Sequence, residues 1–155
     1  MHSHWISYVL LSGLAIALLL AAFTDLRCRR IDNALNASVA LAAPLFWWAS
    51  GLGWSAIGLQ LTVAAACFAV LCGLFALRAM GGGDVKLLTA LALWIRPDWF
   101  VQLVMIMALL GGALTLAVAA WHIARRQRGR VAVPYGVAIA AAGLWILTSD
   151  YLPGL

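Results

Sequence analysis

Six runs of almost purely apolar residues determine what this chain can fold into. They cover residues 5–23, 34–48, 57–77, 79–95, 99–123 and 131–148, and the fourth is broken by glycines. A helix that spans the hydrocarbon core of a bilayer needs about 20 such residues. Six helices of that length use most of the 155 residues, so the loops between them must be short.

The overall composition excludes a soluble protein. Hydrophobic residues make up 66% of the chain and charged residues 10%, against about 45–50% and about 25% in a typical soluble domain. Too few polar side chains are present to cover a soluble fold or to solvate a disordered tail or a separate extramembrane domain. We therefore predict an all-α integral membrane bundle of about six transmembrane helices, formed as a single membrane-embedded domain by residues 1–155.

The basic residues fall mainly in three of the predicted loops. Only Arg96 lies on the opposite side from the other nine, which are Arg27, Arg29, Arg30, Arg78, Lys86, Arg125, Arg126, Arg128 and Arg130. The positive-inside rule places those three loops in the cytoplasm and both termini outside. The membrane topology thus explains the excess of basic residues, and no nucleic-acid partner is expected. Most tryptophans lie near predicted span ends, as in interfacial belts: Trp5, Trp47, Trp48, Trp54, Trp94, Trp99 and Trp121.

Asp84 is the most unusual acidic residue, because it lies inside a hydrophobic run directly after Gly81, Gly82 and Gly83. Counting back from Arg96 at 1.5 Å per residue places it about 18 Å below the outer surface of a core about 30 Å thick. Ionisable groups at such depth are candidates for function. The simpler interpretation is an Asp84–Lys86 pair at the membrane edge. The glycines favour a functional site, since they permit irregular backbone and the close approach of another chain.

Asp25 is the second candidate, although an aspartate beside arginines is ordinarily a solvated loop residue. It ends the first run, on the same predicted side as Asp84. Two neighbouring carboxylates cannot both ionise easily, so one keeps a proton while the other can act as a base toward water. Straight helices would leave the two acids about 12 Å apart in depth. Helix tilt, an unwound glycine segment or a recessed outer loop would close that gap.

Three sequence blocks resemble the type IV prepilin peptidases. The first is Asp-Leu-Arg at residues 25–27, followed by Ile31 and Asn33. The second is Gly-Gly-Gly-Asp-Val-Lys at residues 81–86, which is similar to the family's Gly-x-Gly-Asp block. The third is Pro-Tyr-Gly-Val-Ala-Ile-Ala at residues 134–140, which is similar to its C-terminal signature. The small size resembles the branch that serves Flp (tight-adherence) pili.

This resemblance implies a GxGD-type membrane aspartic protease, with Asp25 and Asp84 as the catalytic pair. It implies cleavage of a short basic leader from prepilin or pseudopilin precursors, at the cytoplasmic face of the bacterial inner membrane. No metal and no organic cofactor are expected. The expected partners are the precursor, membrane lipid and the pilus assembly machinery. Residues expected to bind substrate or shape the site are Gly81, Gly82, Gly83, Lys86, Arg27, Asn33, Pro134, Tyr135 and Gly136.

Two departures from the family pattern and two other functions remain open. Asp32 stands where the family commonly has proline, so it is a rival member of the pair. The chain lacks the paired cysteines of the methyltransferase domain in larger relatives, so we expect no methyl transfer. A small ion or proton transporter could instead use Asp84 and Lys86 to line its path. A non-catalytic subunit of a pilus or secretion machine would tolerate neutral residues at both acids.

Overall fold

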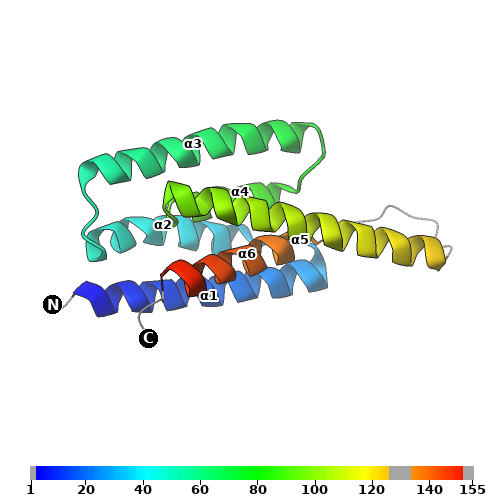
Figure 1. The fold of residues 1–155 in the computed structure, drawn as a ribbon, viewed down its shortest axis with the longest axis horizontal. Coiled ribbons are helices and arrows are strands. Elements are labelled where there is room, and N and C mark those ends of the chain that lie inside the picture. Colours follow the sequence, from blue (N-terminus) through cyan, green and yellow to red (C-terminus); the bar gives the residue numbers. More distant parts are fainter. Residues whose placement is uncertain (1–2, 126–133, 152–155) are drawn as a thin grey trace.

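The computed structural model describes residues 3–125 and 134–151, and the regular secondary structure in this part of the chain is all α-helix. It contains six helices and no strand (Figure 1). They are α1 (Ser3–Cys28), α2 (Asn33–Ala49), α3 (Trp54–Ala76), α4 (Gly82–Ala92), α5 (Pro97–Ala124) and α6 (Tyr135–Asp150). The prediction of an all-α bundle with six helices is confirmed.

The helices differ in length more than the apolar runs suggest. Three stretches are long and apolar enough to cross a membrane, namely Trp5–Cys28, Trp54–Ala76 and Pro97–Ala124. The other helices are shorter, with 17 residues in α2, 11 in α4 and 16 in α6. The helix α4 begins at Gly82, later than the apolar run that starts at residue 79. Arg78 adopts a left-handed backbone conformation with φ 57°, which ends α3. Gly81 then caps α4 in an extended conformation.

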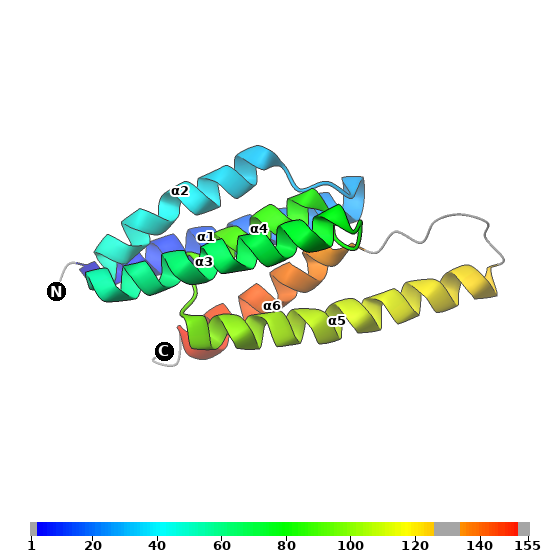
Figure 2. The same ribbon diagram turned by 90° about the horizontal axis from the view of Figure 1, so that it is seen from above.

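The short helix α4 lies at the centre of the bundle. It packs against α2, α3 and α6, while α6 also packs between α1 and α5 (Figures 1 and 2). The ends of α1, α3 and α5 and the starts of α2, α4 and α6 lie toward the same end of the molecule (Figure 1). We call this the basic end, because it carries Arg27, Arg29, Arg30, Arg78, Lys86 and Arg125.

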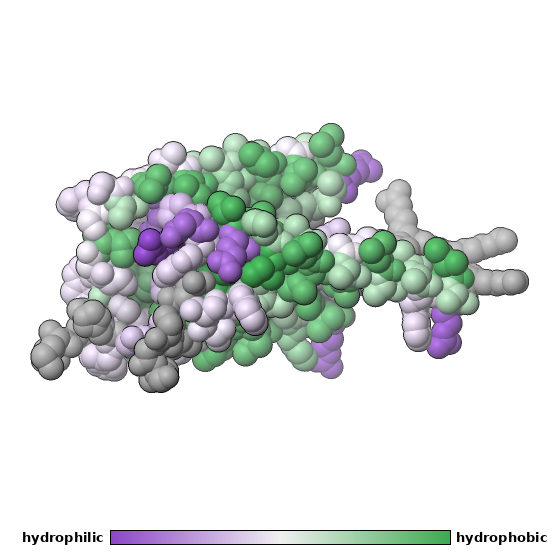
Figure 3. All heavy atoms as spheres, viewed as in Figure 1, coloured by the Kyte–Doolittle hydropathy of each residue, from purple (hydrophilic) through white to green (hydrophobic). Residues whose placement is uncertain are grey.

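Much of the outer surface is apolar. Leu41 of α2 and Leu109 and Leu116 of α5 are all more than 70% exposed. The face seen in Figure 3 is hydrophobic across its middle, with hydrophilic residues toward its ends. Side chains of this kind cannot face water over such an area, but they suit contact with lipid. The chain is a membrane protein.

Two tryptophans that the sequence assigned to interfacial belts hold α4 in place. Trp94 is buried, and its Nε1 donates a hydrogen bond to the carbonyl oxygen of Val39 at 2.8 Å. The Nε1 of Trp47 donates to the carbonyl oxygen of Leu93 at 2.7 Å. For Trp94 the belt interpretation is wrong: the turn after α4 is recessed into the bundle, where its carbonyl and indole groups need partners.

This recessed turn also removes about half of the expected difference in depth between Asp25 and Asp84. Trp94 lines an outer pocket together with Leu11, so the two residues lie at similar depth. Asp25 is 14 residues after Leu11 and Asp84 is ten residues before Trp94. These lengths correspond to about 21 Å and about 15 Å of helix, which leaves a gap of about 6 Å.

Candidate active site

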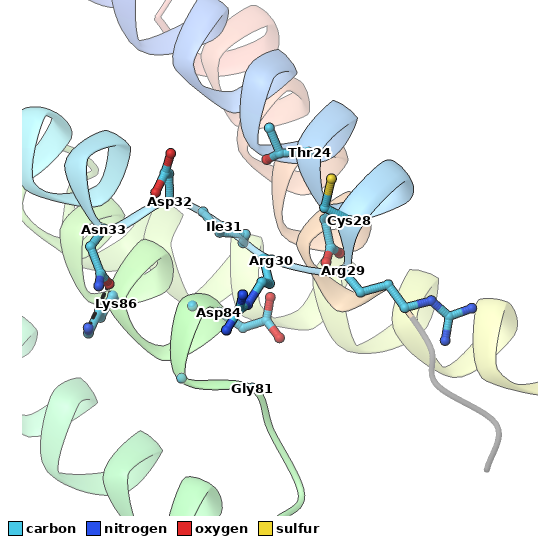
Figure 4. Close-up of a pocket in the computed structure, with 13 residues that line it drawn as sticks. Thr24, Cys28, Arg29, Arg30, Ile31, Asp32, Asn33, Gly81, Asp84 and Lys86 are labelled. Carbon is cyan, nitrogen blue, oxygen red and sulfur yellow. Dashed lines mark hydrogen bonds between the residues drawn. The ribbon is translucent and has the colours of Figure 1, made fainter.

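Asp25 and Asp84 line the same pocket at the basic end of the bundle. Figure 4 shows this pocket, with Asp84 labelled. The pocket has a volume of about 770 Å³. It is lined by residues 24–25 at the end of α1, by residues 28–33 that lead into α2, and by residues 81–84 and 86 at the start of α4. Two acids that are 59 positions apart in the sequence thus face one solvent-accessible space.

Asp25 is held in place by the start of α6. Its side chain is only 6% exposed, and the backbone N–H of Gly136 donates a hydrogen bond to its Oδ2 at 2.8 Å. The backbone N–H of Val137 also acts on this carboxylate. The free N–H groups and the dipole at a helix N-terminus interact favourably with negative charge. The buried carboxylate therefore has a polar partner and a fixed position.

Gly136 leaves no room for a side chain at this contact. A Cβ atom added there would lie 2.8 Å from Asp25 Oδ2 and 2.9 Å from Ile31 Cδ1. Carbon atoms attract one another best at about 3.5–4.0 Å, so these contacts would be repulsive. The close approach of α6 to α1 thus depends on glycine at this position.

Asp84 belongs to the first turn of α4, and the glycines before it let the α1–α2 connection lie close by. A Cβ atom at Gly83 would be 3.2 Å from the Cβ of Ile31, and one at Gly81 would be 2.9 Å from Asp84 Oδ2. The Asp84 carboxylate is near enough to Asp25 for the two charges to interact. The glycines therefore allow two acids from different helices to come together.

Two hydrogen bonds join the start of α2 to the start of α4. Lys86 Nζ donates to Asn33 Oδ1 at 2.8 Å, which is the dashed line in Figure 4. Asn36 Nδ2 donates to the carbonyl oxygen of Gly83 at 3.3 Å. No ion pair between Asp84 and Lys86 is present in the described residues, where the only ion pair lies at the other end of the bundle. The simple interpretation of Asp84 as the partner of Lys86 is therefore wrong.

Four predicted site residues do not line the pocket, and of these only Gly136 bonds to Asp25. The Arg27 guanidinium carbon lies 5.5 Å from the centre of the Phe23 ring. Tyr135 Oη lies 3.3 Å from Thr115 Oγ1, which joins α6 to α5. Pro134 precedes α6 as its N-cap residue. Tyr135 thus acts on the site only through the placement of α6.

The pocket contains charged residues that the sequence did not assign to it. Arg29 and Arg30 line it, and the charge of Arg29 acts on Asp25. The lining carries three acids and three bases, namely Asp25, Asp32, Asp84, Arg29, Arg30 and Lys86. Asp32 is exposed at the N-cap of α2, unlike the buried Asp25. In the described part of the chain, no group of three His, Cys, Asp or Glu side chains could hold a metal ion.

Comparison with known proteins agrees with the first two sequence blocks. The model of a family described as the type IV leader peptidase family matches residues 12–116. This chain belongs to the type IV leader peptidase family. The region that matches the family includes both Asp25 and Asp84, whereas Gly136 lies beyond it. The predicted family is thus confirmed.

Two curated relatives have similar sequences. They are the prepilin leader peptidase/N-methyltransferases of Burkholderia pseudomallei strains 1026b and K96243. Each is 30% identical over 144 residues, which covers 84% of this chain and 43% of the relative. The chain therefore spans less than half the length of these relatives. No solved structure matches this chain.

Proposed function

We propose that this protein is a membrane-embedded aspartic endopeptidase that removes the leader peptide of type IV prepilins. The observation that carries the proposal is the meeting of Asp25 and Asp84, from α1 and α4, in one pocket. The membership of the chain in a leader peptidase family supports the same reaction. The proposal concerns leader cleavage alone.

The chemistry requires only water and the two carboxyl groups. The ionised carboxylate removes a proton from a water molecule, and the water oxygen attacks the carbonyl carbon of the scissile peptide bond. The protonated carboxyl then gives its proton to the departing nitrogen as the C–N bond breaks. The result is one new carboxyl terminus and one new amino terminus, and the pair has exchanged its proton between the two members.

The charge distribution supports an orientation for this reaction. Apart from Arg96, the described basic residues lie at the basic end, where the pocket also opens. The positive-inside rule then favours a cytoplasmic basic end, with both termini outside the bacterial inner membrane. A precursor anchored by an apolar segment would present its junction to the pocket at this face. Among such precursors, we propose prepilins of the Flp type as the substrates.

Co-expression with a tagged precursor tests the proposal. An Flp-type prepilin with a C-terminal tag is followed by its size on gels, beside wild-type enzyme and the variants Asp25→Asn, Asp84→Asn and Asp32→Asn. We expect cleavage by wild type and by Asp32→Asn, and at least a 1000-fold loss, on the order of that for lost catalytic groups, in the other two variants. Equal amounts of each variant in the membrane fraction provide the control for folding.

Two results would contradict the proposal. Wild-type enzyme that inserts normally but cuts none of several Flp-type precursors would exclude the proposed reaction. Loss of cleavage in Asp32→Asn, with activity retained in Asp25→Asn, would exclude the proposed catalytic pair. Proton flux through vesicles that hold the inserted enzyme would then test the transporter alternative.

A further inference from the structure

A second groove begins where the active-site pocket ends. Its volume is about 330 Å³, and it shares Asn33 and Lys86 with the pocket. The first two turns of α2 form one wall, Phe68 of α3 lies on the other, and α4 forms the floor. The two spaces therefore adjoin at the start of α4, at two residues that are hydrogen-bonded to each other.

The groove is open to the outside of the bundle and mostly apolar. Ala37 on one wall is exposed, and Phe68 on the other is 47% exposed. The helix α3 packs mainly on α4, whereas α2 packs on both α1 and α4. Along α4 the lining runs from Lys86 to Leu93, which is about 10 Å, or two helical turns. A second membrane segment could thus enter from the side, without passing through the bundle.

One polar atom in the wall of this groove has no partner in the described part of the chain. Asn36 is only 4% exposed and lines the groove, and its Oδ1 accepts no hydrogen bond. Its Nδ2 is already used by the carbonyl oxygen of Gly83. A buried acceptor without a donor is costly, so an N–H group of a bound molecule that reached Oδ1 would stabilise it.

A peptide segment next to a scissile bond has such a group to offer. In a helix, the backbone N–H groups beyond the first turn are bonded to carbonyl oxygens of the same segment. Attack on a peptide bond requires the chain to be unwound there, which frees an N–H group close to the cleavage point. A lipid acyl chain has no donor and would leave Asn36 Oδ1 unpaired.

We propose that this groove holds the apolar segment of the substrate directly after the scissile bond. The inference rests on the proposed peptidase function. The junction lies in the pocket beside Asp84, the freed N–H group bonds to Asn36 Oδ1, and the next two helical turns lie between α2 and α3. The occupant is a peptide chain of the precursor, and the groove sets the distance from the apolar segment to the cleaved bond.

Filling the groove with a large side chain tests the inference. Ala37 is exposed and lines the groove, so Ala37→Trp fills it without entering the core. Leu41, one turn later on α2, is 77% exposed and does not line the groove, so Leu41→Trp is the matched control. We expect cleavage of the membrane-anchored precursor to fall at least tenfold with Ala37→Trp. With Leu41→Trp it should stay within twofold of wild type.

The same assay separates failure of this inference from failure of the proposed function. If wild type cleaves and Ala37→Trp cleaves at the same rate, the groove is not the substrate site, while the peptidase function stands. If wild type cleaves none of the precursors, the proposed function fails and the groove assignment fails with it.

Cross-linking provides a second readout that does not depend on turnover. The experiment uses the Asp84→Asn variant, which should bind the precursor without cleaving it. The native cysteines of the enzyme are replaced by alanine; they are Cys28, Cys67 and Cys72. A cysteine introduced at Ala37 should form a disulfide with one placed in the first two turns of the precursor's apolar segment. One introduced at Leu41 should not. Cross-links at both positions, or at neither as expected for a groove filled by lipid, would overturn the inference.

Discussion

Replacing Gly136 by alanine should disable the site through a single added carbon atom. The new Cβ would lie 2.8 Å from Asp25 Oδ2 and 3.0 Å from Asp25 Cβ. Relief of these contacts requires the carboxylate and the start of α6 to separate by about 0.5 Å or more. The hydrogen bond from the Gly136 N–H to the carboxylate would then lengthen or break. Gly136→Ala thus changes the position of a proposed catalytic group without removing it.

The expected loss of activity follows from the strength of that bond. A hydrogen bond to a charged group contributes about 1.5–3 kcal/mol, and each 1.36 kcal/mol in the barrier is a factor of ten in rate. Gly136→Ala should therefore lower the cleavage rate by about 10- to 100-fold. The rate is measured from the initial appearance of cleaved precursor, divided by the amount of enzyme in the membrane that remains folded on heating.

Gly143 in the same helix provides the control for packing alone. A Cβ atom there would lie 2.9 Å from Leu18 Cδ1, far from the pocket. Gly143→Ala should lower the thermal stability but leave the rate per folded molecule within about twofold. The reasoning is refuted if Gly136→Ala cleaves as fast as Gly143→Ala.

Three further predictions concern the proton, the α2–α4 contact and the recessed turn. Because the proposed pair needs one proton, cleavage should fall at both low and high pH, and a rate that rises without limit toward high pH would contradict a shared proton. Lys86→Met and Asn33→Ala break the same hydrogen bond, so the double variant should be no slower than the slower single variant; additive losses would show separate roles. Trp94→Phe leaves the carbonyl oxygen of Val39 without its donor and should lower the free energy of unfolding by about 1–3 kcal/mol. Denaturation of the reconstituted protein measures that loss, and an unchanged stability would refute it.

The sequence was sufficient to predict the six helices, because polar residues separate one apolar run from the next. It could not predict where α4 begins or ends. The start depends on the left-handed conformation of Arg78, which nothing in that residue type favours. The end depends on contacts of Trp47 and Trp94 with distant backbone carbonyls. Tryptophan near a span end is as typical of a membrane interface as of such a buried contact.

For the candidate site, the sequence singled out both acids and several residues around them, but not the contacts that hold the acids in place. Asp84 was conspicuous because it lies within an apolar run. Asp25 was singled out because it lies on the same predicted side of the membrane as Asp84. The glycine in the third block gave no hint that its N–H bonds to Asp25, because that contact joins residues 111 positions apart. Ile31, which lies against both Gly83 and Gly136, was named only as part of a block. Its burial next to two arginines is a tertiary effect.

The two acids and the N–H group that fixes one of them come from α1, α4 and α6, which has a consequence for how the protein is made. A ribosome delivers Asp25 with the first helix and Asp84 with the fourth. The N–H of Gly136 comes only with α6, the last helix in the described part of the chain. Until α6 inserts beside α1, Asp25 lacks the contact that fixes it. A nascent chain therefore carries both acids well before the arrangement around them is complete, and maturation of the site is timed by membrane insertion.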